Sequence, residues 1–459
     1  MDNEDIRPVR INGVPLAKIE RVDMHEQASQ TTPPTPEEIA ESIAYEDLIH
    51  EEERKSVLID EEPPKLTDRE VMEHTASIWQ YKPISDNGVE LHTECHAKYT
   101  DADIAEVICA RARGKKHKHD GSNCDDWFET AVIDGCVIAV VADGAGSKPL
   151  SRIGARLCCE GAVEYLKEKL AQLLKDTPTL KGDLASDMTG AAFMAACGKI
   201  APLVQDAARR SFDRVIEHLK TIYNDKTCLA ALGRNPVLAD LSSTFLAAIV
   251  IPLEVDGHRE SFAVTAQIGD GCICGVNSGA DAASCLKLLG EPDSGAFSGE
   301  TEFLSERTIN DNVIAGKTRI SRGRSDVFML MSDGVADDYF PAAPMMKRLY
   351  LDLCLNGILP MQGECTVPEQ PEPIRFRSVS MSQRSVELQY AKQLIPEDGG
   401  AEAVDMLWDK RDALKCHSLE AYRISLGDTA QERLLTWLDN YNERGSFDDR
   451  TLVIIKIKE

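Results

Sequence analysis

The sequence lacks a long hydrophobic segment, an excess of positive charge and a dense cysteine pattern. Its apolar stretches, of which residues 245–253 are an example, are far too short to cross a bilayer. The acidic residues 1–5 do not resemble a signal peptide. A formal net charge of -26 argues against nucleic acid and anionic membranes as partners. The 14 cysteines are scattered through the chain, which predicts reduced thiols in a cytoplasmic protein.

The length of 459 residues allows one large domain and a tail. We interpret residues 1–100 as an acidic, partly disordered N-terminal tail or linker, because proline, threonine and glutamate predominate at residues 31–38 and acidic runs follow. Residues 101–459 are predicted to form the folded domain. An irregular helical pattern predicts an insertion within it at about residues 341–445.

The spacing of apolar residues predicts strands and helices in a layered arrangement. Strands are expected at residues 104–113, 130–133, 137–141, 243–251, 260–268, 271–276, 326–331 and 451–457. Helices are expected at residues 151–174, 347–355 and 429–441, with one or two more at residues 188–223. The dipeptides Asp134-Gly135 and Asp256-Gly257 predict hairpin turns between neighbouring strands.

Three predicted strands end at an aspartate that is followed by glycine. They run into Asp143, Asp270 and Asp333, and a fourth predicted strand begins just after Asp448. Each could simply be a strand capped by an ordinary Asp-Gly turn. Their recurrence instead predicts that the carboxylates meet at one edge of a sheet, where their repulsion has to be neutralised by cations. Divalent cations that prefer oxygen ligands fit this chemistry best.

The order of these motifs resembles that of the metal-dependent type 2C protein phosphatase family. The matching segments are residues 141–146, 242–244, 268–271, 331–335 and 448–451. Residues 114–126, with Gly114, His117 and Asp126, resemble a segment of the family's bacterial-type branch, and Asp449 stands where asparagine is common. The resemblance implies an α+β fold, a four-layer α-β-β-α sandwich in which two antiparallel sheets are flanked by helices and the acids meet at one end.

The resemblance also implies a site for two, or at most three, Mn²⁺ or Mg²⁺ ions. The implied ligands are Asp126 (through a water molecule), Asp143, the carbonyl group of Gly144, Asp270, Asp333 and Asp448. Asp143 would be shared by two ions, one of them held with Asp333 and Asp448 and the other with Gly144. The third, weaker ion would lie at Asp270.

The reaction implied by the resemblance is hydrolysis of phosphate monoesters on serine or threonine by metal-activated water, with Asp143, Asp333 and His117 as catalytic residues. His117 and Lys116 would contact the substrate phosphate, although a histidine in a basic loop can also be merely solvated. Ala145 replaces the histidine that is assigned as general acid in eukaryotic members. The expected partners are a phosphorylated protein substrate and an opposing serine/threonine kinase.

Three alternatives remain at this point. A catalytically weak pseudophosphatase would keep the fold as a binding or regulatory module, although the nearly complete set of acids argues against it. An unrelated α/β protein could use the acids for a structural ion, and Asp143→Ala would then unfold it. A haloacid-dehalogenase-type phosphatase is disfavoured because Asp143-Gly144-Ala145 lacks the second acid that such an enzyme needs.

Overall fold

A computed structural model of the protein describes residues 80–85, 88–292, 301–361, 381–415, 429–440 and 447–458, together with two short strands near the N-terminus. The chain divides into two units, Met1–Thr75 and Ala76–Glu459. In the first unit β1 (Arg10–Ile11) pairs with β2 (Val14–Pro15) in antiparallel orientation. The acidic and proline-rich segments predicted between residues 31 and 64 lie outside the described residues.

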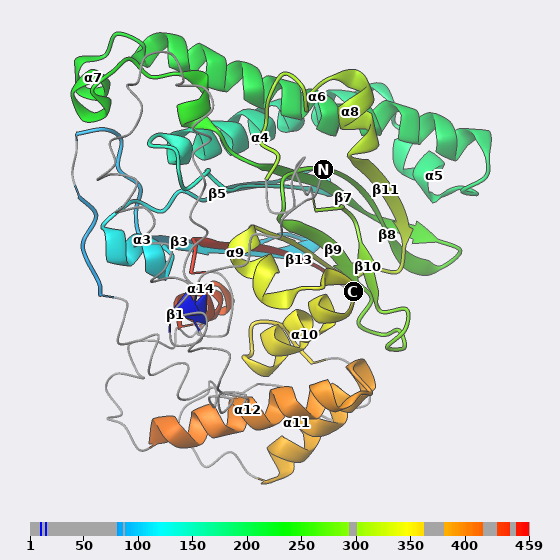
Figure 1. Ribbon diagram of the computed structural model, residues 1–459. Helices are drawn as coiled ribbons and strands as arrows, with labels where there is room; N and C mark the ends of the chain where they lie inside the picture. Colours follow the sequence, from blue (N-terminus) through cyan, green and yellow to red (C-terminus); the bar gives the residue numbers. More distant parts are fainter. Residues whose placement is uncertain are drawn as a thin grey trace, which may run out of the picture. The chain divides into compact units, whose positions relative to one another are not determined.

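Two antiparallel sheets form the centre of the second unit (Figure 1). The six-stranded sheet has the order β10 (Leu286–Leu288), β9 (Cys272–Val276), β12 (Val327–Met331), β13 (Arg450–Ile457), β4 (Ala105–Ala112) and β3 (Cys95–Asp101). The five-stranded sheet has the order β11 (Thr318–Gly323), β8 (His258–Ile268), β7 (Phe245–Val255), β6 (Cys136–Ala142) and β5 (Trp127–Ile133). All neighbouring strands are antiparallel.

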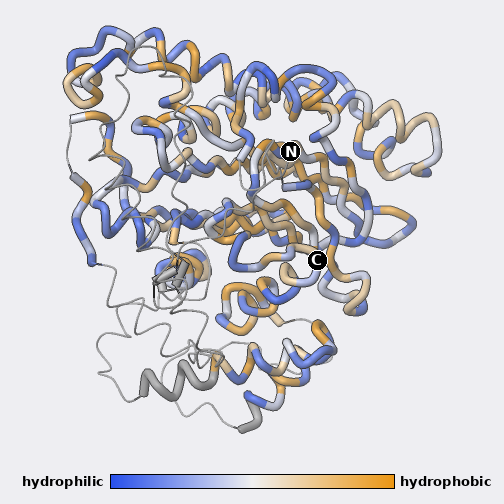
Figure 2. Tube along the Cα trace, in the orientation of Figure 1, coloured by the Kyte–Doolittle hydropathy of each residue, from blue (hydrophilic) through white to orange (hydrophobic). Residues whose placement is uncertain are grey.

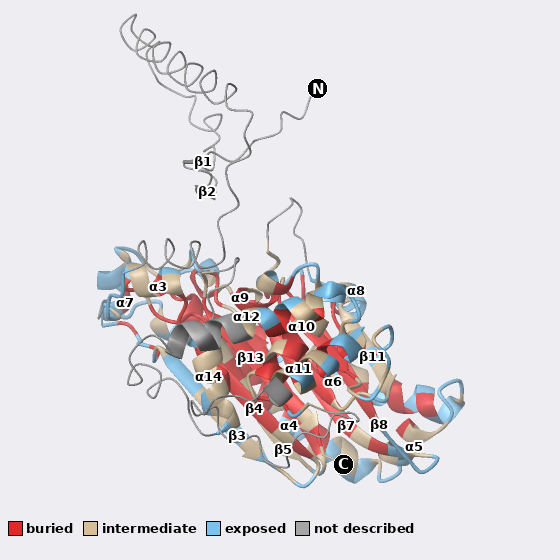
Figure 3. Cartoon of the chain, turned by 90° about the horizontal axis from the view of Figure 1, so that it is seen from below, coloured by how far each residue is buried: buried red, intermediate tan, exposed pale blue. Residues whose placement is uncertain are grey.

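The two sheets pack face to face through an apolar layer that includes Val137, Leu246, Leu330 and Val453. Every residue of β6 is buried, because one face of this strand meets the other sheet and the opposite face meets helices. This position explains why its sequence is a continuous apolar run rather than an alternating one. Apolar residues follow the central strands in Figure 2, and the same strands are buried in Figure 3.

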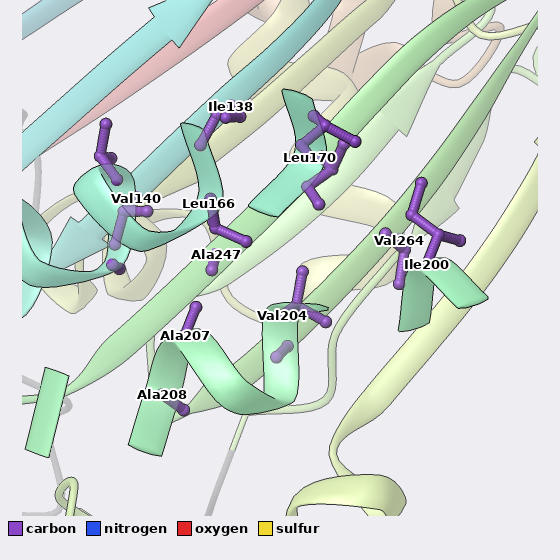
Figure 4. Packing of buried hydrophobic residues seen from close by; sticks show 14 of the residues in the cluster. Ile138, Val140, Leu166, Leu170, Ile200, Val204, Ala207, Ala208, Ala247 and Val264 are labelled. Carbon is purple, nitrogen blue, oxygen red and sulfur yellow. The ribbon is translucent and has the colours of Figure 1, made fainter. Parts of the chain in front are cut away.

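Helices α4 (Ser151–Asp176) and α6 (Ala191–Ile222) cover the outer face of the five-stranded sheet (Figure 1). The shorter helices α5 (Leu180–Ala185) and α7 (Lys226–Leu232) flank α6 in the chain. Leu166 and Leu170 of α4, with Val204 of α6, join one apolar cluster with Ile138 and Val264 of the sheet (Figure 4). Helix α6 is a single long helix, where one or two were predicted.

The outer face of the six-stranded sheet is covered by helices from the region predicted as an insertion. Helices α10 (Ala342–Leu355) and α14 (Ala430–Asn440) contact its strands, whereas α11 (Met381–Leu394) and α12 (Asp398–Lys415) pack on α10. Leu349 of α10 and Leu434 of α14 are fully buried in the same cluster as Met329 and Ile454 of the sheet. These helices therefore form the fourth layer of the sandwich, and the predicted α-β-β-α architecture is confirmed.

Three strands at sheet edges, β3, β10 and β11, were not predicted from the sequence. β3 and β11 carry polar, half-exposed residues and lack an apolar run, because each has a neighbour on one side only. β3 already includes residues 95–100, which the sequence suggested were part of the N-terminal tail. No helix in the described part of the chain is both long and apolar enough to span a membrane.

Candidate metal centre

Three of the predicted acids lie at ends of strands on the same edge of the sandwich. Asp143 directly follows β6, Asp270 lies between β8 and β9, and Asp333 opens the short helix α9 (Asp333–Ala336) after β12. Carboxylate oxygens of these three residues lie within 4.8 Å of one another. The fold thus brings together side chains that are 63 to 190 residues apart in the sequence. The charge of Asp448, which precedes β13, contributes to raising the pKa of both Asp143 and Asp333.

The segment that carries Asp143 is fixed by Ser242, Ser243 and Thr244. The Asp143 amide donates to Thr244 Oγ1 at 2.8 Å, and the Thr244 amide donates to the Asp143 carbonyl at 2.8 Å. The Ala145 amide donates to the Ser242 carbonyl at 3.0 Å. The serine-threonine segment therefore holds the backbone that presents the Asp143 carboxylate.

The glycines that follow Asp143 and Asp333 allow other backbone segments to approach closely. A Cβ atom on Gly144 would lie 2.7 Å from the Asp125 carbonyl oxygen, and one on Gly334 would lie 1.9 Å from the Asp449 carbonyl oxygen. Neither glycine has a positive φ. These positions exclude any side chain because of packing and not because of turn geometry.

Asp126 is fully buried beside Ser332, the residue before Asp333. Ser332 Oγ donates to Asp126 Oδ2 at 2.8 Å and accepts from the Thr451 amide at 3.0 Å. Burial and the charge of Asp449 raise the pKa of Asp126 to about 7. One hydroxyl group therefore links the segments that carry Asp126, Asp333 and Asp448.

The carboxylates of the cluster disfavour one another's charged form. Burial raises the pKa of Asp143 well above its ordinary value, and the charges of Asp333 and Asp126 raise it further. Burial and the charge of Asp270 likewise raise the pKa of Asp333 well above its ordinary value. A divalent cation would reverse this balance, and a donor set made only of oxygen atoms suits Mg²⁺ or Mn²⁺. The residues present therefore fit the metal ions that were predicted.

His117 lies in the short helix α3 (Lys115–Asp120) and is only 3% exposed, so it is not a solvated loop residue. Its Nε2 atom is 3.4 Å from Asp448 Oδ1, and its Nδ1 atom is 2.8 Å from Asp449 Oδ2. Burial alone would lower the pKa of His117, but the charges of Asp449 and Asp448 raise it to about 10. Lys116 differs from His117 because its side chain is exposed.

Asp449 is a residue whose role was missed from the sequence, where it seemed a small change from asparagine. Its carboxylate accepts hydrogen bonds from the amides of Gly114, at 2.6 Å, and Asp125. Burial opposes its ionisation, but the charge of His117 holds the pKa of Asp449 below its ordinary value. The presence of both Asp449 and His117 in the sequence was the feature from which this role could have been predicted.

Comparison with known proteins gives the class to which this fold and site belong. A family profile described as "Protein phosphatase 2C" matches residues 113–354, more than half of the chain. The chain therefore belongs to the protein phosphatase 2C family, as its motifs predicted. The matched range contains Asp126, Asp143, Asp270 and Asp333 and ends before Asp448. No curated protein sequence matches the chain.

Several solved structures resemble the chain at low sequence identity. A serine-threonine phosphatase 2C from Toxoplasma gondii is 12% identical, with 79% of this chain and 99% of that one covered and a TM-score of 0.36. RsbX in complex with magnesium is 10% identical, with 79% and 100% covered and a TM-score of 0.29. The SiaA-PP2C domain of Pseudomonas aeruginosa is 9% identical, with 92% and 98% covered and a TM-score of 0.29.

Proposed function

We propose that the protein is a metal-dependent serine/threonine phosphoprotein phosphatase that hydrolyses phosphate monoesters. The observation that carries the proposal is the meeting of the Asp143, Asp270 and Asp333 carboxylates within 4.8 Å at one end of the sandwich. Two or three Mn²⁺ or Mg²⁺ ions bound there would generate a nucleophile from water at neutral pH and neutralise charge on the phosphoryl group. No protein nucleophile is then needed.

The carboxylates divide the work of holding these ions. Asp143 would be shared between two ions, with Asp333 and Asp448 on one side and the Gly144 carbonyl group on the other. Asp126 would hold coordinated water, and Asp270 would support a third ion. The close approach of Gly144 to Asp125 supports this arrangement, because it places the residue next to Asp126 against the first Asp-Gly segment.

His117 and Lys116 are the proposed contacts to the substrate phosphate. A Cβ atom on Gly146 would lie 3.7 Å from His117 Nε2, so this nitrogen faces the loop that follows Asp143. His117 is proposed as a catalytic residue because a cationic imidazole at this place would stabilise negative charge that develops on the phosphoryl group. Lys116, on the exposed side of the same helix, would attract the phosphate from solution.

The substrate is proposed to be a phosphorylated protein, and its partner enzyme an opposing serine/threonine kinase. A cytoplasmic location belongs to the same proposal. It is supported by the cysteines, since the twelve that lie within the described residues are free thiols and eleven of them are buried. Phosphorylation of serine and threonine by cytoplasmic kinases is the chemistry that such an enzyme would reverse.

Hydrolysis of para-nitrophenyl phosphate, with and without Mn²⁺, tests the proposal. We expect activity only with Mn²⁺, and a loss of about 100-fold or more in Asp333→Asn because a direct ligand is removed. Asp326→Asn is the matched control. Asp326 precedes the first residue of β12, at the end of the strand opposite Asp333, and its carboxylate accepts a hydrogen bond from the Ser278 amide at 2.7 Å. A wild-type protein that binds Mn²⁺ but hydrolyses nothing would instead be the binding or regulatory pseudophosphatase.

A further inference from the structure

The Asp449 carboxylate connects two parts of the metal centre that are far apart in the sequence. Its side chain is 1% exposed, and its contacts come from one segment, residues 114–125. The Gly114 amide donates to Oδ1 at 2.6 Å, the Asp125 amide donates to Oδ2, and His117 Nδ1 lies 2.8 Å from Oδ2. Two buried backbone donors and one imidazole nitrogen thus share a single carboxylate.

The same region is held by backbone contacts on both sides of Asp449. The Lys116 amide donates to the Phe447 carbonyl at 3.0 Å, and a Cβ atom on Gly114 would lie 2.3 Å from the Asp448 carbonyl carbon. On the other side, the Asp449 carbonyl oxygen packs against Gly334, the residue after Asp333. The segments that carry Asp126, Asp333 and Asp448 therefore all meet at Asp449.

We propose that Asp449 is a positioning residue that, together with His117, sets the spacing of Asp126, Asp333 and Asp448 for tight binding of the metal ions. The inference rests on the proposed metal centre but not on turnover. A carboxylate suits this place because all three neighbours can donate to it. An asparagine would offer one acceptor oxygen and would turn its own NH₂ group toward one of the donors.

Calorimetric titration of Mn²⁺ into the full chain tests the proposal directly. Groups that hold metal ligands in place typically change affinity by roughly 10- to 100-fold when they are removed. We therefore expect Asp449→Asn to bind Mn²⁺ about tenfold more weakly or worse, while Asp326→Asn binds it as the wild type does. Unchanged affinity in Asp449→Asn, or an equal loss in the two variants, would overturn the proposal.

Two substitutions at His117 provide an independent test that leaves Asp449 intact. His117→Asn keeps a nitrogen donor close to the position of Nδ1, whereas His117→Ala removes it. We expect His117→Asn to retain the Mn²⁺ affinity of the wild type and His117→Ala to lose about tenfold. Equal affinities in these two variants, or the reverse order, would contradict the positioning role.

Circular dichroism of each variant identifies loss of fold as a separate cause. If Asp449→Asn and His117→Ala both remain unfolded in saturating Mn²⁺, Asp449 is a folding determinant and the positioning role is rejected. Failure of the positioning role is distinguishable from failure of the phosphatase proposal, because calorimetry measures Mn²⁺ binding without any turnover. A wild-type protein that binds Mn²⁺ without hydrolysing para-nitrophenyl phosphate would defeat the activity and leave this inference standing.

Discussion

Gly334→Ala is expected to destabilise the fold and the metal centre together. The new methyl group would lie 1.9 Å from the Asp449 carbonyl oxygen, where ordinary contacts begin at 3.4 Å. The obstacle is backbone at the start of β13, so no flexible side chain can move away. Either α9 or β13 has to shift, and overpacking of this kind costs about 1–3 kcal/mol, or more when backbone blocks relief.

Gly198→Ala is the matched control for this substitution. Gly198 lies inside α6 with nothing within 4 Å of its would-be Cβ atom, so alanine there should stabilise the helix by up to about 1 kcal/mol. Urea unfolding of both variants in EDTA gives the two free-energy changes, which should have opposite signs.

The same shift would displace Asp333 relative to Asp448, because the clash lies between the residues that follow them in the chain. Mn²⁺ affinity in Gly334→Ala should therefore fall, whereas Gly198→Ala should bind Mn²⁺ normally. Equal urea midpoints for the two alanine variants would refute the reasoning, since it would mean that the approach of Gly334 to Asp449 is not tight in solution.

Three further predictions concern the charges of the metal centre. The metal-free protein should lose thermal stability as pH rises from about 4 to about 7. The pKa of Asp126 is raised from 3.8 to about 7, so the folded state binds more protons than the unfolded state in this window. Melting curves in EDTA should show this fall in melting temperature, and saturating Mn²⁺ should flatten it. Ser332→Ala should cost about 1–3 kcal/mol in urea unfolding, because the Thr451 amide loses its buried acceptor and Asp126 loses a donor. Asp143→Asn should be folded and inactive. In EDTA at pH 8 it should melt at a higher temperature than the wild type, because one of the charges that repel each other is gone. An unfolded Asp143→Asn would favour the alternative that the acids hold a structural ion.

Much of the sheet framework could be predicted from the sequence because the central strands are buried on both faces. β6 and β12 are continuous apolar runs for this reason, and their ends placed Asp143 and Asp333 correctly at one edge. β3 escaped prediction because it is an edge strand with exposed polar residues. The role of Asp449 escaped because its hydrogen-bond partners, Gly114 and Asp125, are more than three hundred residues away.

The Asp-Gly dipeptides show why local pattern alone could not complete the site. Asp134-Gly135 and Asp256-Gly257 have positive φ at both residues, so they are the hairpin turns that the dipeptide predicts. Asp143-Gly144 has the same two residues without a positive φ, and its glycine is required by the approach of the Asp125 backbone. The distinction depends on a contact between the end of β6 and the residues just before β5, its neighbour in the same sheet, which the dipeptide itself does not reveal.

Carboxylates from both sheets meet at one end of the sandwich. Asp143 comes from the five-stranded sheet, while Asp333 and Asp448 come from the six-stranded sheet. Gly144 packs against Asp125 within the five-stranded sheet. Gly334 packs against Asp449 within the six-stranded sheet. Packing within each sheet therefore fixes where these carboxylates stand, and we expect the affinity of the proposed metal centre to depend on this packing as well as on the carboxylates themselves.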